Sequence, residues 1–364
     1  MPEWRPIHRH IALGVLLVLI VGAIVALENV GRKSTVPPPP ADIPAHLASF
    51  TSAPNFEGAT GWINTDQPID LVSLRGNVTL VDFWTYSCIN CIRTFPYLNA
   101  WHDTYKDRGL TIIGVHSPEF RFERDRDNVM EATERHDIEH AVAQDNDFSI
   151  WKAYHNRYWP AKYLVDQYGK IRYTHFGEGD YAGTEHQIRL LLQEAGHDPG
   201  PTSGIAERET SGGRTPELYA GGSRASIGNP EGYHPGETIT YVKPSQLAAD
   251  RIYLSGTWYN DDENLRAESG ATIFVKFHGA GGNFVAGGAD GRCASAFLDD
   301  QTFPPDRAGQ DVSYEGGIAC IRLDGARSYD FYGGPNEAHL LELRVPDGFE
   351  LFTFAFSSSP TNEG

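Results

Sequence analysis

Two cysteines separated by two residues are the first feature of this sequence that suggests chemistry. Cys88 and Cys91 directly follow a strand-like apolar run, 78–84, and begin a stretch with helical spacing. The free N–H groups and the dipole of a first helical turn stabilise a thiolate on Cys88. A thiolate is the attacking species in disulfide exchange, and Cys91 is near enough along the chain to resolve a mixed disulfide. We therefore predict that Cys88 is the exposed nucleophile and Cys91 the buried resolving thiol of a redox-active pair.

Two alternatives for this pair have less support. A structural zinc site usually needs two further Cys or His ligands, and the sequence has no second pair of this kind and no His pair at finger-like spacing. A purely structural disulfide across so short a loop would add little stability. We predict that the site uses no metal and no organic cofactor.

The other two cysteines, Cys293 and Cys320, lie far from the dithiol in the sequence. An oxidising compartment would allow them to form a structural disulfide. Sequence alone does not place their Cα atoms within bonding separation, so this pairing stays open.

The elements that must position the dithiol follow an alternating α/β pattern over residues 54–196. The run 78–84 is almost continuously apolar and contains β-branched residues, which is typical of a buried central strand. The pattern then predicts a helix from the dithiol onward, a strand at 110–115, a helix at 127–136, a hairpin of strands 163–165 and 171–173, and a last helix around 188–192. This order predicts a small sheet covered by helices on both faces.

A charge-free apolar run, 11–27, precedes these elements. Its length is at the short end of what spans a bilayer. A cleaved signal peptide is the alternative, but the residues after the run form a poor cleavage site. We predict a cytoplasmic tip and one transmembrane helix within 1–36, with the rest of the chain on the outer side of the membrane. Residues 37–53, which include four consecutive prolines, form a stiff linker.

The last part of the chain has an all-β pattern. Residues 197–216 are rich in Gly, Pro, Ser, Thr and Glu and read as a linker. From 217 to 364, short apolar and aromatic runs alternate with turn residues.

The net charge of −18 makes the protein a poor partner for nucleic acid.

Several segments resemble known proteins. Residues 81–91 resemble the strand-to-dithiol region of thioredoxins, and Pro96 matches the helix-kinking proline of that family. Residues 159–163 resemble the segment with the cis-proline opposite the dithiol, and 114–119 resemble a strand end in extracytoplasmic thioredoxins of the TlpA and ResA type. Taken together, the segments most resemble the extracytoplasmic C-terminal half of DipZ proteins, from about residue 54 onward.

The resemblance implies roles for five more residues. Asp82 would be the buried carboxylate behind Cys91 that takes and returns the proton of the resolving thiol. Glu119 would be a second carboxylate near the pair that modulates the cysteine pKa, although an ordinary loop acid is an equal alternative. Pro160, in the cis form, would present backbone to the substrate. Trp159 would line that groove or lie in the core, and Trp84 would partly pack in the core and partly cover the site.

The resemblance also implies the nature of the second domain and the partners. Residues 217–364 would form a jelly-roll-like β-sandwich similar to a carbohydrate-binding module, with cell-wall glycans as a candidate ligand. Candidate aromatic residues for stacking on sugars are Trp258, Tyr259, Tyr233 and Tyr332, and core packing is the alternative for each.

The function implied is reduction, or else oxidation or isomerisation, of disulfides in exported proteins. A membrane electron donor of the CcdA/DsbD type is the implied partner, and the fused membrane domain of DipZ is missing from this chain. Two alternatives stay open. One is a glycan- or protein-binding surface protein with an accessory thioredoxin scaffold. The other is a peroxidase of the same fold, which the paired cysteines disfavour.

Overall fold

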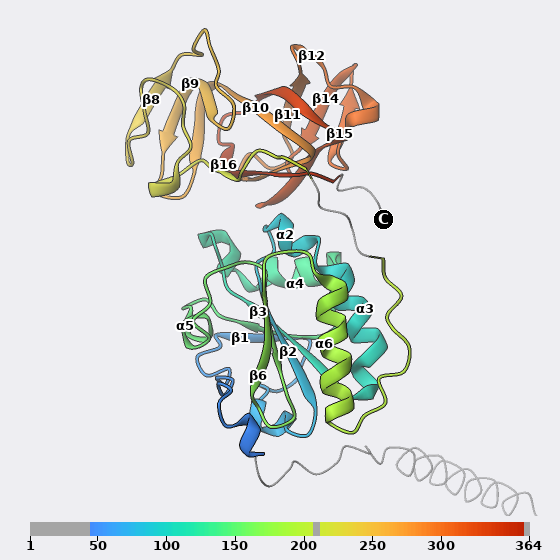
Figure 1. Cartoon of the computed structure of the whole chain (residues 1–364). Coiled ribbons are helices and arrows are strands. Elements are labelled where there is room, and N and C mark those ends of the chain that lie inside the picture. The colour runs from blue at the N-terminus through green and yellow to red at the C-terminus, as the bar shows by residue number, and fades with distance from the viewer. Residues whose placement is uncertain (1–43, 207–211, 360–364) are drawn as a thin grey trace, which may run out of the picture. The chain divides into compact units, whose positions relative to one another are not determined.

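The computed structural model describes residues 44–206 and 212–359. Within these residues there is no helix of the length and apolar character needed to cross a membrane. The predicted anchor within 1–36 and the first part of the linker, residues 37–43, lie outside the described residues. The described residues contain an α/β region followed by an all-β region (Figure 1).

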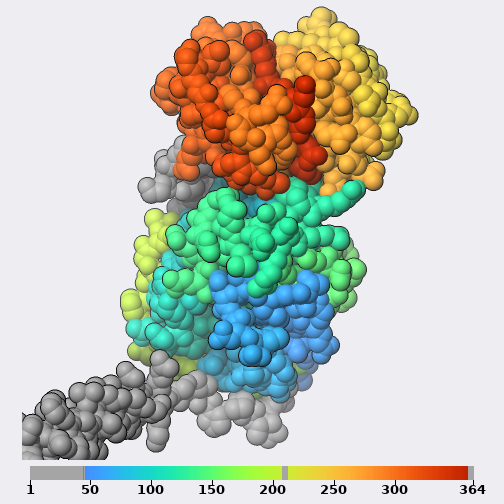
Figure 2. Space-filling view, turned by 180° about the vertical axis from the view of Figure 1, so that it is seen from behind, coloured from blue at the N-terminus to red at the C-terminus, as the bar shows by residue number. Residues whose placement is uncertain are grey.

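The α/β region is built on a six-stranded mixed sheet in the order β1-β4-β3-β2-β5-β6. Its strands are β1 (Gly61–Ile63), β2 (Val78–Trp84), β3 (Leu110–His116), β4 (Ala141–Gln144), β5 (Ala161–Val165) and β6 (Ile171–Phe176). β2, β3 and β4 run parallel, whereas β1, β5 and β6 pair antiparallel. In Figure 2 the first described residues (blue) lie beside the green residues near β4, as the pairing of β1 with β4 requires.

Helices cover the sheet unevenly. The helices are α2 (Ile89–Ile92), α3 (Phe95–Tyr105), α4 (Arg126–Arg135), α5 (Ser149–Ala153) and α6 (Tyr181–Glu194). α3, α4 and α6 pack against one face, where Val78, Leu80 and Ile112 point into the core. α5 and the chain before β2 cover the other face, where Val81 and Phe83 point. Because side chains alternate along a strand, Asp82 points to the face that carries α3.

The helix predicted to run on from the dithiol is interrupted. α2 ends at Ile92, and α3 begins at Phe95 with Thr94 as its N-cap residue. Pro96 lies in the first turn of α3, where its missing N–H group has no intrahelical partner to lose. The helix predicted from the dithiol onward is therefore divided in two, and Pro96, which matches a helix-kinking proline, lies at the start of the second helix.

The all-β region contains one connected ten-stranded sheet in which every pairing is antiparallel. Its strands are β7 (Leu218–Tyr219), β8 (Thr238–Tyr241), β9 (Ile252–Asn260), β10 (Leu265–Gly287), β11 (Cys293–Leu298), β12 (Gln301–Thr302), β13 (Val312–Glu315), β14 (Ile318–Arg322), β15 (Arg327–Arg344) and β16 (Glu350–Ser357). The long strands β10 and β15 pair with register shifts near Gly281. Such bulges bend strands, so the sheet wraps around one apolar core.

Two of the four predicted sugar-stacking residues lie in this core. Trp258 and Tyr332 are both 0% exposed, so their rings cannot stack on a sugar at the surface. Tyr233 and Tyr259 are partly exposed. The prediction failed for the first two because a strand's apolar pattern does not distinguish an aromatic residue that faces the core from one that faces solvent.

The second pair of cysteines is bonded in the structure. Cys293 and Cys320 lie on the neighbouring strands β11 and β14, with their Cα atoms 5.5 Å apart. The structural disulfide that the sequence left open is therefore present.

Candidate active site: a dithiol backed by buried charges

The dithiol lies where β2 ends and α2 begins. Cys88 is the N-cap residue of α2, and its Sγ accepts a hydrogen bond from the Cys91 backbone N–H at 3.4 Å. Cys88 is partly exposed, whereas Cys91 is 0% exposed, and both are free thiols. The accessible sulfur is thus held at the first turn of the helix and the second sulfur is enclosed.

Asp82 lies on the same face of the sheet as Cys91 and is 1% exposed. Burial raises the pKa of Asp82 to about 7, and the charge of Lys162 opposes this increase. Burial also raises the pKa of Cys91, with further contributions from Cys88 and Asp82. A carboxyl group that titrates near neutrality beside a buried thiol has the properties needed to exchange a proton with it.

The structure adds a buried cation that the sequence prediction missed. Lys162 on β5 is directly opposite Asp82 in the β2–β5 ladder and is 0% exposed. Directly opposed residues have their Cβ atoms about 4.5–5.5 Å apart, so the two charges interact across the strands. Burial lowers the pKa of Lys162, and the charges of Asp82 and Cys91 oppose this decrease. Lys162 lies inside the otherwise mainly apolar stretch 161–165, just as Asp82 lies inside the apolar run 78–84.

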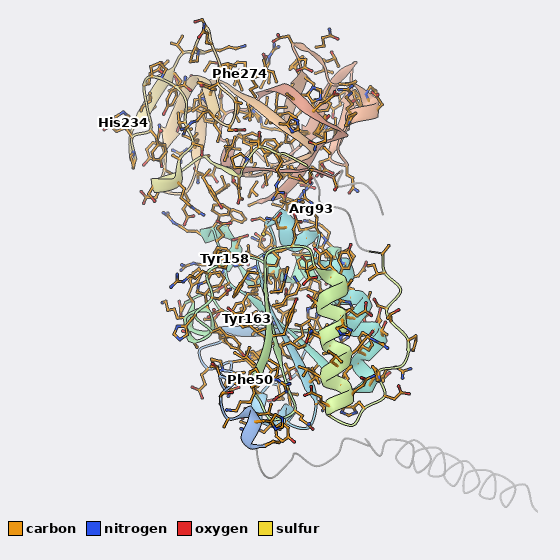
Figure 3. All side chains as sticks on the ribbon, in the orientation of Figure 1. Phe50, Arg93, Tyr158, Tyr163, His234 and Phe274 are labelled. Carbon is orange, nitrogen blue, oxygen red and sulfur yellow. A yellow bond between two sulfur atoms is a disulfide. The ribbon has the colours of Figure 1, made fainter. Side chains whose placement is uncertain are left out.

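Pro160 and Trp159 precede β5. The peptide bond between them is cis, as the resemblance implied. The Trp159 indole is partly buried, donates a hydrogen bond to the Ser117 carbonyl at 3.0 Å, and contacts Trp151. The roles of Pro160 and Trp159 in substrate binding stay predictions. In Figure 3, Tyr158 and Arg93 lie toward one end of the α/β region, and Phe50 lies toward the other end.

Trp84 lies in the core and not on the surface of the site. It is 1% exposed and packs edge-to-face against Phe95 and His116. A fully enclosed ring cannot contact a substrate, so only the packing part of the prediction for Trp84 agrees with the structure.

His116 is buried and stacks on Tyr86, and burial lowers the pKa of His116 to about 3.

Glu119 is engaged away from the dithiol. Its carboxylate accepts hydrogen bonds from Arg224 at 2.7 Å and from the Tyr219 hydroxyl at 3.1 Å. These partners belong to the all-β region. The contacts of Glu119 that the structure describes therefore do not support its predicted role beside the cysteines.

A second buried carboxylate, Glu123, was missed by sequence reasoning. It is 0% exposed and accepts hydrogen bonds from the Ser87 N–H at 3.2 Å and from the Ser87 hydroxyl at 2.6 Å. Burial raises the pKa of Glu123 to about 7, while the hydrogen bonds from Ser87 and Phe120 lower it. Its sequence neighbourhood alternates arginine and phenylalanine, and this pattern alone does not indicate whether Glu123 is buried.

Comparisons with known proteins agree with this architecture. Residues 51–174 match the AhpC/TSA family, and residues 215–357 match a family described as thioredoxin like C-terminal domain. With the sheet and the dithiol at the end of β2, the first match supports a thioredoxin-like fold for the α/β region.

Particular relatives refine this class. Over 278 residues the chain is 40% identical to the protein DipZ of Mycobacterium bovis, an alignment that covers 74% of this chain and 39% of that protein. The thiol-disulfide oxidoreductase YkuV of Bacillus subtilis is 28% identical over 141 residues, which cover 39% of this chain and 94% of YkuV. A solved thiol-disulfide isomerase from Corynebacterium glutamicum is 25% identical, with a TM-score of 0.36, and covers 38% of this chain and 96% of that structure. The α/β region that holds the dithiol is thus similar to a protein named as a thiol-disulfide oxidoreductase.

Proposed function

We propose that this protein is a membrane-anchored, extracytoplasmic thiol–disulfide oxidoreductase that reduces disulfides of exported proteins. One observation carries the proposal: a partly exposed Cys88 thiol at the start of a helix, paired with an enclosed Cys91 thiol beside a carboxyl group that titrates near neutrality. The name of YkuV supports the reaction class.

The proposed reaction has two steps. The Cys88 thiolate attacks one sulfur of the client disulfide, forms a mixed disulfide, and displaces the first client sulfur as a thiolate. Cys91 then passes its proton to Asp82, and its thiolate attacks the Cys88 sulfur and releases the second client thiolate. The two client thiolates take up the proton held by Asp82 and the proton that Cys88 released to solvent on ionisation. The client disulfide has then been reduced to a dithiol, and Cys88–Cys91 has become a disulfide.

The partners and location are part of this proposal. A membrane electron donor of the CcdA/DsbD type would reduce the Cys88–Cys91 disulfide again, and the apolar run 11–27 would anchor the chain with its catalytic domain outside the cytoplasmic membrane. Glycan binding by a sandwich-like C-terminal domain has less support, because Trp258 and Tyr332 are enclosed in its core.

The full-length protein tests the reaction directly. With dithiothreitol as reductant, it should accelerate reduction of insulin, and Cys88→Ser or Cys91→Ser should abolish the acceleration. The double variant Cys293→Ser/Cys320→Ser keeps the dithiol and should remain active. The opposite result would be an inactive Cys293→Ser/Cys320→Ser variant together with active Cys88→Ser and Cys91→Ser variants. That result would show that the second pair of cysteines carries out the redox chemistry, and it would reject the proposal.

The location needs a separate test in cells. If the dithiol domain is outside the membrane, a membrane-impermeant maleimide should label Cys88 in intact cells or spheroplasts that express the full chain. Labelling only after lysis would reject the proposed location without affecting the proposed reaction.

A further inference from the structure

The carboxylate of Glu123 joins the dithiol loop to a neighbouring loop. Glu123 lies in η4 (Arg121–Arg124), which follows β3, and its side chain is fully enclosed. Oε1 accepts both hydrogen bonds from Ser87, in the segment between β2 and α2. Oε2 accepts hydrogen bonds from the backbone N–H groups of Glu119 at 2.5 Å and Phe120 at 2.8 Å. One carboxylate therefore links the segments that follow two adjacent parallel strands, β2 and β3.

Capping of η4 explains only part of this arrangement. A capping carboxylate at the third helical position needs to reach only the backbone N–H of the N-cap residue, here Phe120. The two bonds to Ser87 lie outside that requirement. A buried hydrogen bond contributes about 0.5–1.5 kcal/mol, and more when one partner is charged, so the two contacts together restrain Ser87.

Ser87 is covalently joined to Cys88, so its position affects the reactive sulfur. The Cys88 N–H donates to the Thr85 carbonyl at 3.3 Å, and the Cys88 sulfur accepts from the Cys91 N–H. Any shift of Ser87 changes the direction of the Cys88 backbone and, with it, the approach of the sulfur to the first turn of α2. A reacting group displaced by about 1 Å can lose two orders of magnitude in rate.

We propose that Glu123 is a positioning residue for the dithiol, holding Ser87 so that the Cys88 sulfur stays directed at the Cys91 N–H. This inference rests on the proposed redox role of Cys88. It assigns Glu123 no contact with substrate and no transfer of a proton.

The test compares two buried carboxylates with similar hydrogen bonds. Glu185 on α6 accepts from the Ser203 N–H, the Ser203 hydroxyl and the Tyr105 hydroxyl, and it serves as the matched control. Glu123→Gln and Glu185→Gln, each in the full-length chain, replace one acceptor oxygen by an NH₂ donor. For both variants, we would measure the urea midpoint, the rate of Cys88 alkylation by iodoacetamide, and the equilibrium with a glutathione redox buffer.

We expect both variants to lower the urea midpoint, but only Glu123→Gln to change the chemistry of Cys88. Its alkylation rate should change by about fivefold or more, and its equilibrium constant with glutathione by about threefold or more. The inference is overturned if folded Glu123→Gln has the wild-type alkylation rate and the wild-type equilibrium constant with glutathione. It is also overturned if Glu185→Gln changes these two quantities as much as Glu123→Gln does. If Glu123→Gln does not fold, Ser87→Ala decides: we expect an alkylation rate changed by about twofold or more, and an unchanged rate overturns the inference.

These outcomes are separate from failure of the proposed function. A wild-type protein that does not reduce insulin rejects the redox role itself. An active wild-type protein whose Cys88 reactivity is insensitive to Glu123→Gln rejects only the positioning role.

Discussion

Asp82 determines how the second step of the proposed reaction depends on pH. Burial raises its pKa to about 7, so Asp82 is protonated below that pH and is a carboxylate above it. Only the carboxylate can accept the Cys91 proton, so release of the client should accelerate as the pH rises through about 7. Asp82→Asn removes the acceptor and should slow release at pH 8 by about 10- to 100-fold.

Stopped-flow mixing of the reduced protein with a disulfide-bearing peptide resolves the two steps. In Asp82→Asn, formation of the mixed disulfide should proceed, and the rise in release rate near pH 7 should disappear. A pH profile for release identical to that of the wild type would remove Asp82 from the mechanism.

Lys162 should set the pH at which this rise occurs. Its positive charge favours the ionised form of Asp82 and opposes the effect of burial. Without this charge the pKa of Asp82 increases, so Lys162→Met should move the midpoint of the release profile to higher pH by about one unit. The exposed Lys152 provides a control, because Lys152→Met should leave the midpoint unchanged. A midpoint in Lys162→Met that stays at the wild-type pH would show that the two buried charges are not coupled.

At the scale of elements, Asp145 joins the end of β3 to α5. Its carboxylate is 0% exposed and accepts hydrogen bonds from the Ser117 hydroxyl and from the N–H groups of Ile150 and Trp151. Asp145→Ala leaves these buried donors unpaired and should lower the free energy of unfolding by about 2–3 kcal/mol, as measured by urea denaturation. The exposed Asp147 is the control, and Asp147→Ala should change stability by less than about 0.5 kcal/mol. If Asp145→Ala also lowers the free energy of unfolding by less than about 0.5 kcal/mol, the hydrogen bonds to the Asp145 carboxylate contribute little to stability.

The long elements of the α/β region could be predicted from the sequence because their patterns extend over many residues. β2, β3, α4, α6 and the β5–β6 hairpin all lie where the apolar pattern placed them. β1 and β4 have three and four residues, which is too short for a clear period, and their pairing joins residues about 80 positions apart. Such strands are defined by tertiary contacts and not by local sequence.

The site was predictable only where a single residue type contrasted with its surroundings. The spacing of Cys88 and Cys91 and the acid within an apolar strand were visible in the sequence. Glu123 lies in a short segment that mixes charged and aromatic residues, so only the folded chain reveals that its carboxylate is buried against Ser87. The hydrogen bond from Arg224 to Glu119 likewise joins segments that are about 100 residues apart in the sequence, so the sequence alone did not indicate it.

At the scale of the whole molecule, the Cys293–Cys320 disulfide should stabilise the all-β region independently of the dithiol. The bond closes a loop with a sequence separation of 27 residues. Cross-links of this size stabilise by about 2–4 kcal/mol, largely by restricting the unfolded chain. We therefore expect Cys293→Ser/Cys320→Ser to lower the free energy of unfolding of this region by that amount in guanidinium denaturation, with a wild-type rate of insulin reduction. Stability equal to that of the oxidised wild type would show that the cross-link is energetically neutral.

The central claim is that Cys88 attacks the client and Cys91 resolves the mixed disulfide, and trapping with the single cysteine variants tests it most directly. Each full-length variant is incubated with a disulfide-bearing peptide, and the products are identified by intact mass spectrometry. Cys91→Ser, which keeps the accessible sulfur, should accumulate the peptide adduct on Cys88, whereas Cys88→Ser should accumulate almost none. An adduct that forms with Cys88→Ser alone would reverse the two roles and contradict the account of the site.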